Sequence, residues 1–147
     1  MKALLRNLIV PAVMAFAVAG CGGDDPIGPG NGGPPPDISG TYDIVSFTQG
    51  GFTLTPPAVS GTFTVGQTSS SDTEASGTIS LDITVPDGMG GFTNIVDAGT
   101  YTIRSNGSWE QDTQQQALGT YSLVGNTLTV TVTEPAQAAS TSVWQRQ

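Results

Sequence analysis

Hydrophobic and polar residues alternate along short stretches of the chain from residue 38 onward. The clearest stretch is 78–85, in which Ile, Leu or Val alternate with Thr, Ser and Asp. This period of two is typical of a β-strand that buries one face. The only stretch with helical character is a turn at 114–117, so the pattern predicts an all-β domain. Besides 75–85, strands are predicted at 38–48, 58–66, 91–96 and 141–147, with a long loop at 68–75.

A hairpin is predicted at 119–133, where Gly125-Asn126 interrupts two alternating stretches. Glycine and asparagine tolerate the positive φ angles of a two-residue turn. With these two residues in the loop, every hydrophobic residue of one strand faces a partner on the same side of the hairpin. The predicted pairs are Leu123 with Leu128, Tyr121 with Val130, and Gly119 with Val132.

A second hairpin is predicted at 99–113. A two-residue loop at 106–107 would place Ile103 opposite the charged Glu110. A three-residue loop that also contains residue 105, with Gly107 in a left-handed conformation, instead places Ile103 opposite Trp109. We favour the three-residue loop because it keeps the charge away from the core.

A triplet of Gly, Thr and a hydrophobic residue recurs at irregular intervals, which argues against a solenoid repeat. We interpret each triplet as the start of a strand, where glycine permits a bend and the third residue points inward. The triplets begin at Gly40, Gly61, Gly77, Gly99 and Gly119. Together, the patterns predict eight or nine short strands in an antiparallel up-and-down β-barrel. A β-sandwich is the alternative, because sequential hairpins occur in both folds.

The first 20 residues have the pattern of a secretory signal peptide. Lys2 and Arg6 precede an apolar run at 8–19, and small residues precede Cys21. This junction resembles the lipobox of bacterial lipoproteins, which implies that Cys21 is acylated and becomes the first residue after cleavage. Residues 21–37 are rich in Gly and Pro and predict a flexible tether to a domain at 38–147.

Charge excludes one class of partner. The chain has 12 Asp and Glu against 4 Lys and Arg, and loss of residues 1–20 removes two of those four cations. Nucleic-acid affinity comes mostly from Lys and Arg, so we expect no nucleic-acid binding. Anionic lipid head groups would also repel the domain, so membrane attachment would depend on the acyl groups of Cys21.

Several segments resemble bacterial lipocalin-like domains. They include 40–46, 99–109, 119–129 and the final Val143-Trp144-Gln145-Arg146. The resemblance implies a closed barrel in which an aromatic residue of the first strand packs on an arginine of the last strand. In this chain the aromatic residue is Tyr42, where the family has a tryptophan, and the arginine is Arg146.

The residue types present leave little catalytic chemistry. There is no His, and Cys21 is the single cysteine. Catalysis by Ser-His or Cys-His pairs and zinc sites of His and Cys are therefore excluded. Paired carboxylates remain, at Glu110 and Asp112 or at Asp72 and Glu74, and calcium binding by loop carboxylates is chemically conceivable. We interpret these groups as surface charge and expect no enzyme activity, metal or cofactor.

Aromatic residues are the remaining candidates for function. They either fill the barrel as core or line a cavity for an apolar molecule. The candidate pocket residues are Tyr42, Phe63, Tyr101, Arg104, Trp109 and Tyr121. We expect a non-catalytic binding module of the cell envelope, with a lipophilic molecule as the candidate ligand, at the outer membrane facing the periplasm or the cell surface. The alternative is a structural or interaction lipoprotein with a filled barrel and an envelope protein as partner.

Overall fold

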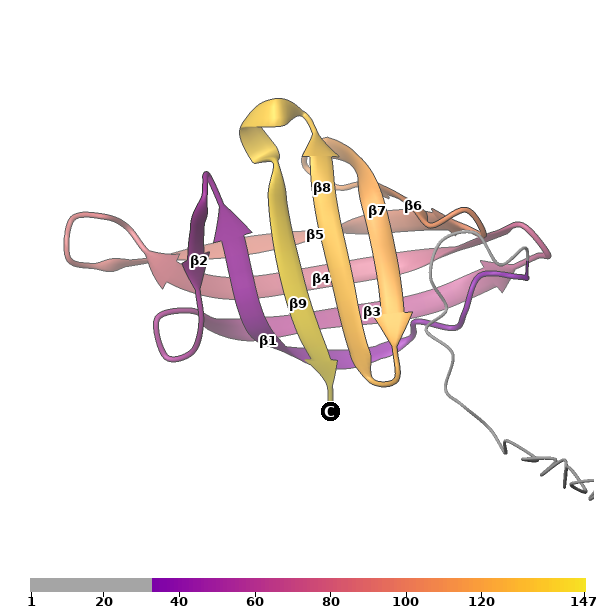
Figure 1. The fold of residues 1–147 in the computed structure, drawn as a ribbon, viewed down its shortest axis with the longest axis horizontal. Helices are drawn as coiled ribbons and strands as arrows, with labels where there is room; N and C mark the ends of the chain where they lie inside the picture. Colours follow the sequence, from indigo (N-terminus) through magenta and orange to yellow (C-terminus); the bar gives the residue numbers. More distant parts are fainter. Residues whose placement is uncertain (1–32) are drawn as a thin grey trace, which may run out of the picture.

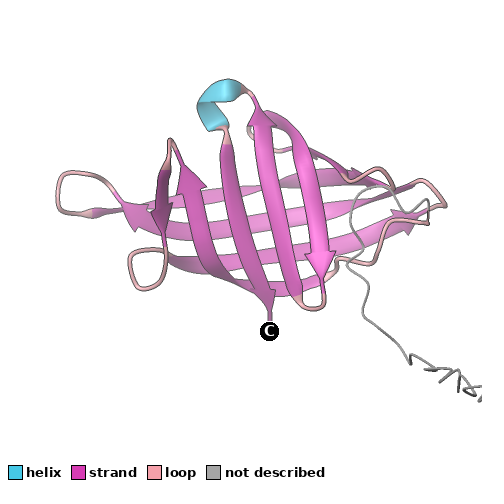
Figure 2. Ribbon diagram, viewed as in Figure 1, coloured by secondary structure: helices cyan, strands magenta, loops and turns pink. Residues whose placement is uncertain are grey.

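The computed structural model describes residues 33–147, which form nine β-strands and one short 3₁₀-helix. In chain order the elements are β1 (Gly40–Gln49), β2 (Phe52–Leu54), β3 (Ser60–Ser70), β4 (Glu74–Pro86), β5 (Phe92–Arg104), β6 (Ser108–Asp112), β7 (Gln116–Val124), β8 (Thr127–Glu134), the 3₁₀-helix η1 (Ala136–Ala138) and β9 (Ser140–Arg146). Strands make up most of this part of the chain (Figure 2), so the predicted all-β class is confirmed.

Eight of the strands close into an antiparallel barrel. From β3 onward each strand pairs with the next as far as β9. β1 pairs with β3 on one side and with β9 on the other, which closes the circuit. The closing ladder runs from Tyr42 opposite Arg146 to Gln49 opposite Ser140. Figure 1 shows β7, β8, β9 and β1 in front of β3, β4 and β5, which cross behind them. The predicted up-and-down barrel is confirmed, and the sandwich alternative is wrong.

The ninth strand, β2, lies outside the closed circuit. Residues 40–43 of β1 pair with β3, whereas residues 47–49 pair with β2. β1 therefore separates from β3 part way along its length, and β2 continues the ladder from there. The hydrophobic pattern did not reveal β2, because a strand of three residues is too short to show a period of two.

Both predicted hairpin registers are confirmed. Leu123 lies opposite Leu128 and Tyr121 opposite Val130, around the turn at Gly125-Asn126. In the other hairpin Ile103 lies opposite Trp109, and Gly107 has a φ of +83° in the three-residue loop. Turn chemistry and hydrophobic pattern agreed at both places, which fixed the register.

Three predicted boundaries are wrong. The predicted strand at 91–96 and the first half of the 99–113 hairpin are one strand, β5, which pairs with β4 along its whole length. The predicted loop at 68–75 shrinks to residues 71–73, because the backbone N–H of Ser71 donates to the carbonyl of Glu74 at 2.7 Å. The predicted helical turn at 114–117 is absent, since β7 already begins at Gln116. Among the described residues, the helical turn is η1, which lies between β8 and β9 directly after Pro135.

The glycines of the recurrent triplets lie mostly inside strands, not at their starts. Gly77 is inside β4 and Gly119 is inside β7. A Cβ atom at Gly77 would lie 1.9 Å from the carbonyl oxygen of Gly66, and one at Gly119 would lie 1.8 Å from that of Thr131. Neighbouring strands approach so closely here that only glycine fits. The interpretation as strand starts is therefore wrong at these positions.

The alternation along β4 is confirmed by burial. Ile79, Ile83 and Val85 are buried, and Leu81 packs against the same core. The core is continuous around the barrel and includes buried residues of every strand except β2. Its aromatic members are Tyr42, Phe63, Tyr101, Trp109, Tyr121 and Trp144.

Candidate functional site

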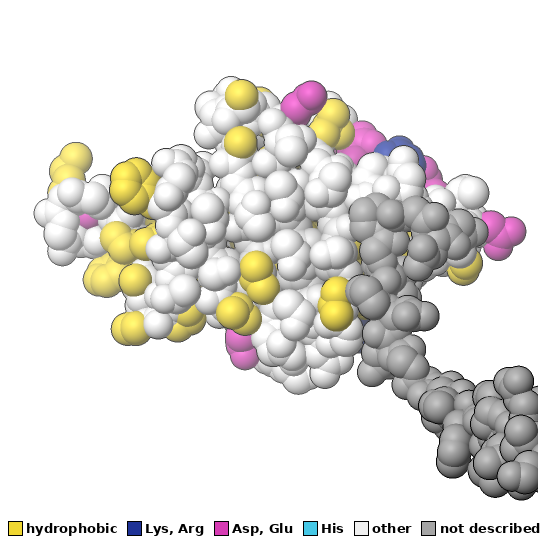
Figure 3. Space-filling model, viewed as in Figure 1, with side chains coloured by type: hydrophobic (Ala, Val, Ile, Leu, Met, Phe, Trp, Pro, Cys, Tyr) yellow, Lys and Arg dark blue, Asp and Glu magenta, His cyan; other side chains and the backbone are white. Residues whose placement is uncertain are grey.

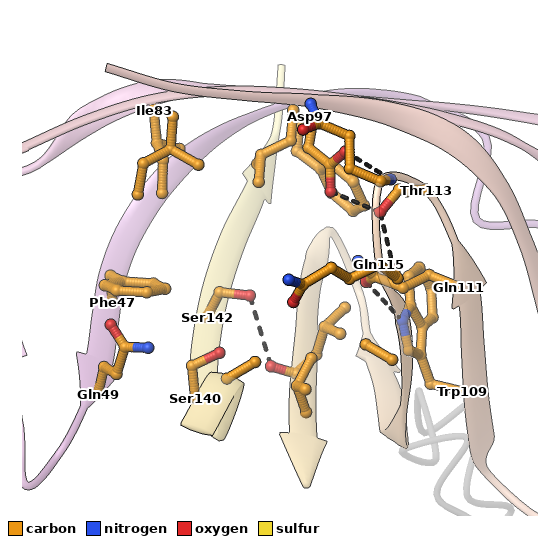
Figure 4. Close-up of a pocket in the computed structure, with 18 of the residues that line it drawn as sticks. Phe47, Gln49, Ile83, Asp97, Trp109, Gln111, Thr113, Gln115, Ser140 and Ser142 are labelled. Atoms are coloured by element: carbon orange, nitrogen blue, oxygen red, sulfur yellow. Dashed lines mark hydrogen bonds between the residues drawn. The ribbon is translucent and has the colours of Figure 1, made fainter. Parts of the chain in front are cut away.

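One half of the barrel interior holds a cavity of about 440 Å³. The cavity lies toward the end of the barrel where β1 finishes and β9 begins, because its lining includes Gln49 and Ser140. Figure 4 shows the labelled side chains from several strands arranged around this space. The barrel is therefore neither solid throughout nor hollow throughout.

Three aromatic residues form the inner part of the lining. The ring centroids of Phe63 and Trp144 are 5.1 Å apart, and those of Phe63 and Trp109 are 6.3 Å apart. Tyr101 stacks on Trp109 with a centroid distance of 5.5 Å and an angle of 8° between the ring planes. Phe63, Trp109 and Trp144 line the cavity, whereas Tyr101 does not. These three rings, here called the aromatic floor, separate the cavity from the filled half of the barrel.

Aliphatic and aromatic side chains extend the apolar surface above the aromatic floor. Phe47 comes from β1, and further members come from β4, β5, β7 and β8, with those of β4 and β8 facing each other. Because these strands lie on opposite sides of the barrel, the apolar lining surrounds the inner cavity rather than covering one wall. The members from β4 and β8 are Leu81, Ile83, Val130 and Val132.

Polar side chains surround the outer part of the cavity. Almost all of them are uncharged amides or hydroxyls, and Figure 4 shows them from both sides of the space. The side-chain amide oxygen of Gln111 accepts a hydrogen bond from the indole N–H of Trp109 at 3.1 Å. These polar lining residues are Gln49, Gln111, Thr113, Gln114, Gln115, Ser140 and Ser142.

Asp97 is the single charged residue among the described residues that line the cavity. Its carboxylate accepts a hydrogen bond from the Thr113 hydroxyl at 2.6 Å and from the backbone N–H of Ala98 at 3.0 Å. The backbone N–H of Gln114 lies 3.4 Å away and also donates. All three donors are neutral, so they orient the carboxylate without cancelling its charge.

Neither arginine of residues 33–147 lines the cavity. Arg104 lies on the outer surface, where it bridges Glu74 and Glu110 at 3.2 Å each. These ion pairs are substantially exposed and contribute little stability. Arg146 lies at the opposite end of the barrel, beside Tyr42. Within the described part of the chain, the cavity therefore has one negative charge and no positive charge.

The other half of the barrel is filled and capped. Residues 35–39 lie against this end, with Pro35 and Ile38 buried, so packing begins before the predicted domain start. The hydroxyl of Tyr42 donates to the carbonyl of Ile38 at 2.7 Å, and Arg146 reaches the carbonyl of Asp37 at 3.3 Å. The backbone N–H of Ser39 holds the pKa of the Asp37 carboxyl below its ordinary value. The chain thus enters the barrel at the end opposite the cavity.

Two further tyrosines fill this half. Tyr101 donates to the amide oxygen of Gln67 at 3.5 Å, and Tyr121 donates to the carbonyl of Arg104 at 3.3 Å. Burial raises the pKa of both phenols, and for Tyr101 the nearby Asp37 carboxylate raises it further. Both hydroxyls are structural, because neither side chain reaches the cavity lining.

The structure separates the six candidate pocket residues into three groups. Phe63 and Trp109 line the cavity. Tyr42, Tyr101 and Tyr121 lie in the filled half, and Arg104 lies on the outer surface in its ion pairs. Tyr42 and Arg146, the proposed closure pair, are brought together: the guanidinium carbon lies 5.2 Å from the centre of the tyrosine ring. Alternation along a strand identified inward residues but not their depth along the barrel axis.

Sequence reasoning missed the polar part of the lining. A signal for it exists in β9, where Ser140, Ser142 and Trp144 share one face, so that face changes from polar to apolar along the strand. Trp109 and Gln111 show the same change on β6. An inward strand face that becomes polar toward one end indicates a cavity that opens there.

Exposed hydrophobic residues gather beside the cavity mouth. Phe52 is 79% exposed, Met89 95% and Phe92 65%. Figure 3 shows hydrophobic side chains concentrated at the end of the molecule that carries β2 and the loop between β4 and β5. Ile95 and Val96 are exposed and also line the cavity, so the apolar surface continues from the outside into the interior.

The remaining predicted chemistry lies elsewhere or outside the described residues. Cys21 lies outside the described residues. Glu110 and Glu74, members of the two carboxylate pairs, are bound to Arg104 on the outer surface. In residues 33–147 no three Asp, Glu, His or Cys side chains are grouped to hold a metal ion. No helix in this same part of the chain has the length and hydrophobicity needed to span a bilayer.

Comparisons with protein-family models, curated protein sequences and solved structures find no significant match. Function is therefore inferred from the cavity and from the sequence.

Proposed function

We propose that this protein is an envelope lipoprotein, anchored through acyl groups on Cys21, whose barrel binds a lipophilic small molecule without catalysing a reaction. The observation that carries the proposal is the open cavity above the aromatic floor. Its volume of about 440 Å³ lies within the range of roughly 300 to 1,000 Å³ found for small-molecule sites. An apolar interior with polar groups near the mouth suits a molecule that has one apolar end.

The apolar surface beside the mouth supports the same function. A lipophilic molecule that leaves water or a membrane would first contact Phe52 and Phe92, then Ile95 and Val96, before it reaches the interior. Each contact replaces water against apolar surface, which stabilises the molecule along its route. This continuous apolar route is a reason to favour a ligand-binding barrel over a purely structural one.

A binding role is favoured over the alternative of a filled structural barrel. The aromatic floor divides the interior, and only the half behind it is filled with side chains. Free strand edge among the described residues includes β2 and residues 92–99 of β5, which pair with β4 alone, so the preference for binding rests on the cavity and not on a lack of strand edges. Lining side chains that are apolar, hydroxyl or amide groups with one carboxylate support binding rather than catalysis.

The position of the tether agrees with an anchored binding module. Residues 35–39 pack against the closed end beside Tyr42. With Cys21 held in a membrane, the tether would join the barrel at its closed end and leave the mouth accessible. An outer-membrane location facing the periplasm or the cell surface is part of the proposal.

Two measurements test the two halves of the proposal. For the anchor, mass spectrometry of the chain isolated from membranes should show a diacylglyceryl group on Cys21, and Cys21→Ala should remove the protein from the membrane fraction. For binding, we define the unacylated chain as residues 21–147 with Cys21→Ser; every strand pairing lies within it. Native mass spectrometry of this chain, exported and purified without detergent, should show an added mass that denaturation releases. An apo mass in every preparation, with no uptake from an extracted lipid fraction, would contradict the binding function.

A further inference from the structure

The polar lining of the cavity indicates the chemistry of the ligand's head group. We propose that the cavity takes a single-chain amphiphile with an uncharged, hydrogen-bonding head group, such as a hydroxyl, a glycerol ester or an amide. Asp97 is the specificity-determining residue that excludes anionic head groups such as carboxylates and phosphates. This inference rests on the proposed binding function and narrows it.

The apolar half of the cavity accommodates the chain of the ligand. The aromatic floor closes the inner end, and Leu81, Ile83 and Val130 surround the space above it. A volume of about 440 Å³ is near the lower end of the range for ligand sites, so one alkyl chain fits better than the two of a phospholipid. The polar end of such a chain then lies near the mouth.

The outer lining matches an uncharged head group. Gln49 and Gln115 each offer both a donor and an acceptor, and the Ser142 hydroxyl, which donates to the carbonyl of Val130 at 3.4 Å, offers an acceptor. These groups pair with hydroxyl, ester and amide groups. A ligand hydroxyl that reaches this level replaces its water contacts with these side chains. A half-buried polar group of the ligand that finds such hydrogen-bond partners avoids the free-energy cost of a buried group without a partner.

An anionic head group finds no compensating positive charge among the described residues that line the cavity. Asp97 is half-buried, and its hydrogen-bond donors are the Thr113 hydroxyl and backbone N–H groups, all neutral. Both arginines of residues 33–147 are bound elsewhere, Arg104 to Glu74 and Glu110 and Arg146 to Tyr42. A ligand carboxylate would therefore lie near a second negative charge in a partly desolvated site, which is unfavourable.

The charge of the whole chain acts in the same direction. Carboxylates outnumber cations 12 to 4 over the full sequence. A cavity with apolar walls focuses this negative field toward its mouth and lowers the local concentration of anions. A basic residue at the mouth would have reversed the expected selectivity.

The test compares two ligands that share one alkyl chain, monododecanoyl glycerol and dodecanoate, each kept below its micelle concentration. Trp109 and Trp144 are the chain's two tryptophans, and both line the cavity, so tryptophan emission of the unacylated chain reports binding directly. At about pH 8, where a carboxylate is ionised, we expect the glycerol ester to bind at least about tenfold more tightly. Higher ionic strength should narrow the difference by improving dodecanoate binding, since salt screens the repulsion.

Asp97→Asn tests the assigned residue. It removes the charge but keeps a side-chain oxygen for the Thr113 hydroxyl, so we expect dodecanoate to gain about tenfold in affinity and the glycerol ester to change little. Asp72→Asn is the matched control, because it makes the same charge change in the exposed turn between β3 and β4, outside the cavity lining. It should leave both affinities unchanged.

Each outcome has a defined meaning. Tighter binding of the ester, with the gap reduced by salt and by Asp97→Asn, supports the inference. Equal or tighter binding of dodecanoate overturns head-group selection but leaves the proposed function intact. Binding of neither ligand overturns this inference, and uptake from the extracted lipid fraction then decides the proposed function separately. If Asp97→Asn does not fold, the salt dependence of the unmodified chain decides, and identical salt responses of the two ligands overturn the role of charge.

Discussion

Arg146 donates two hydrogen bonds to the hydroxyl oxygen of Tyr42, at 2.7 and 3.1 Å, across the ladder that joins β9 to β1. The same hydroxyl donates to the carbonyl of Ile38. One phenol therefore connects the last strand, the first strand and the segment that caps the closed end. The pair marks the seam of the barrel and fixes the end opposite the cavity.

Tyr42→Phe should destabilise the fold by about 1 to 2 kcal/mol. The substitution keeps the ring but leaves the carbonyl of Ile38 and the Nε–H and Nη2–H donors of Arg146 without their hydrogen-bond partner. Urea unfolding followed by tryptophan emission gives the free energy of unfolding. Arg104→Gln is the control, since its ion pairs are exposed and should contribute less than about 1 kcal/mol. A larger loss from Arg104→Gln than from Tyr42→Phe would contradict the closure role.

Gly119→Ala should destabilise the barrel by about 3 kcal/mol or prevent folding. The new Cβ atom would lie 1.8 Å from the carbonyl oxygen of Thr131, which forces β7 and β8 apart. Gly33→Ala is the matched control, because a Cβ atom at that position would have no neighbour within 4 Å. Similar free energies of unfolding for both variants would show that the strands do not approach as closely as described.

Stability should decrease at alkaline pH. Burial raises the pKa of Tyr101 and Tyr121 above the ordinary 10.0, so the folded state keeps protons that the unfolded state releases. Their contribution is fully present below about pH 9 and is lost as the pH rises past 10, by up to about 1.4 kcal/mol per pH unit for each phenol. Urea midpoints between about pH 7 and 11 measure this loss, and Tyr101→Phe should reduce its slope. A flat profile up to about pH 11 would contradict the burial of these hydroxyls.

Ala117→Phe should block the cavity. Ala117 is buried in the lining, so a larger side chain there occupies the space of the ligand and should weaken binding of a lipophilic probe at least about tenfold. The adjacent Leu118 is 38% exposed and does not line the cavity, so Leu118→Phe is the matched control and should bind normally. Tryptophan emission titrations of both variants make the comparison. Equal affinities would place the ligand outside the cavity.

Local chemistry explains which parts of the fold the sequence predicted. At Gly125-Asn126 the turn residues and the hydrophobic partners specify the same register, and at Trp109 a single alternative placed a charge in the core. Where two constraints agree, a register follows from the sequence. β2 lacked such constraints, because three residues beside two glycines carry no measurable period.

The site was harder to predict because a period of two gives direction but not depth. Tyr101 and Trp109 both point inward, yet only Trp109 borders the cavity. Depth depends on strand tilt and stagger, which the closed barrel sets as a whole. Gln111 and Ser142 were missed for a related reason: polar residues on an inward face look like outward ones unless the register is already known.

The most direct measurement of the central claim uses single-tryptophan chains and brominated ligands. Trp144→Phe leaves Trp109, and Trp109→Phe leaves Trp144, each as the only emitting residue on the aromatic floor. A long-chain alcohol that carries bromine at its far end should quench both tryptophans strongly, because the chain end reaches the floor. The same alcohol with bromine beside the hydroxyl should quench them weakly. Equal quenching by the two alcohols, or none by either, would contradict a cavity that binds the ligand chain first and its head group at the mouth.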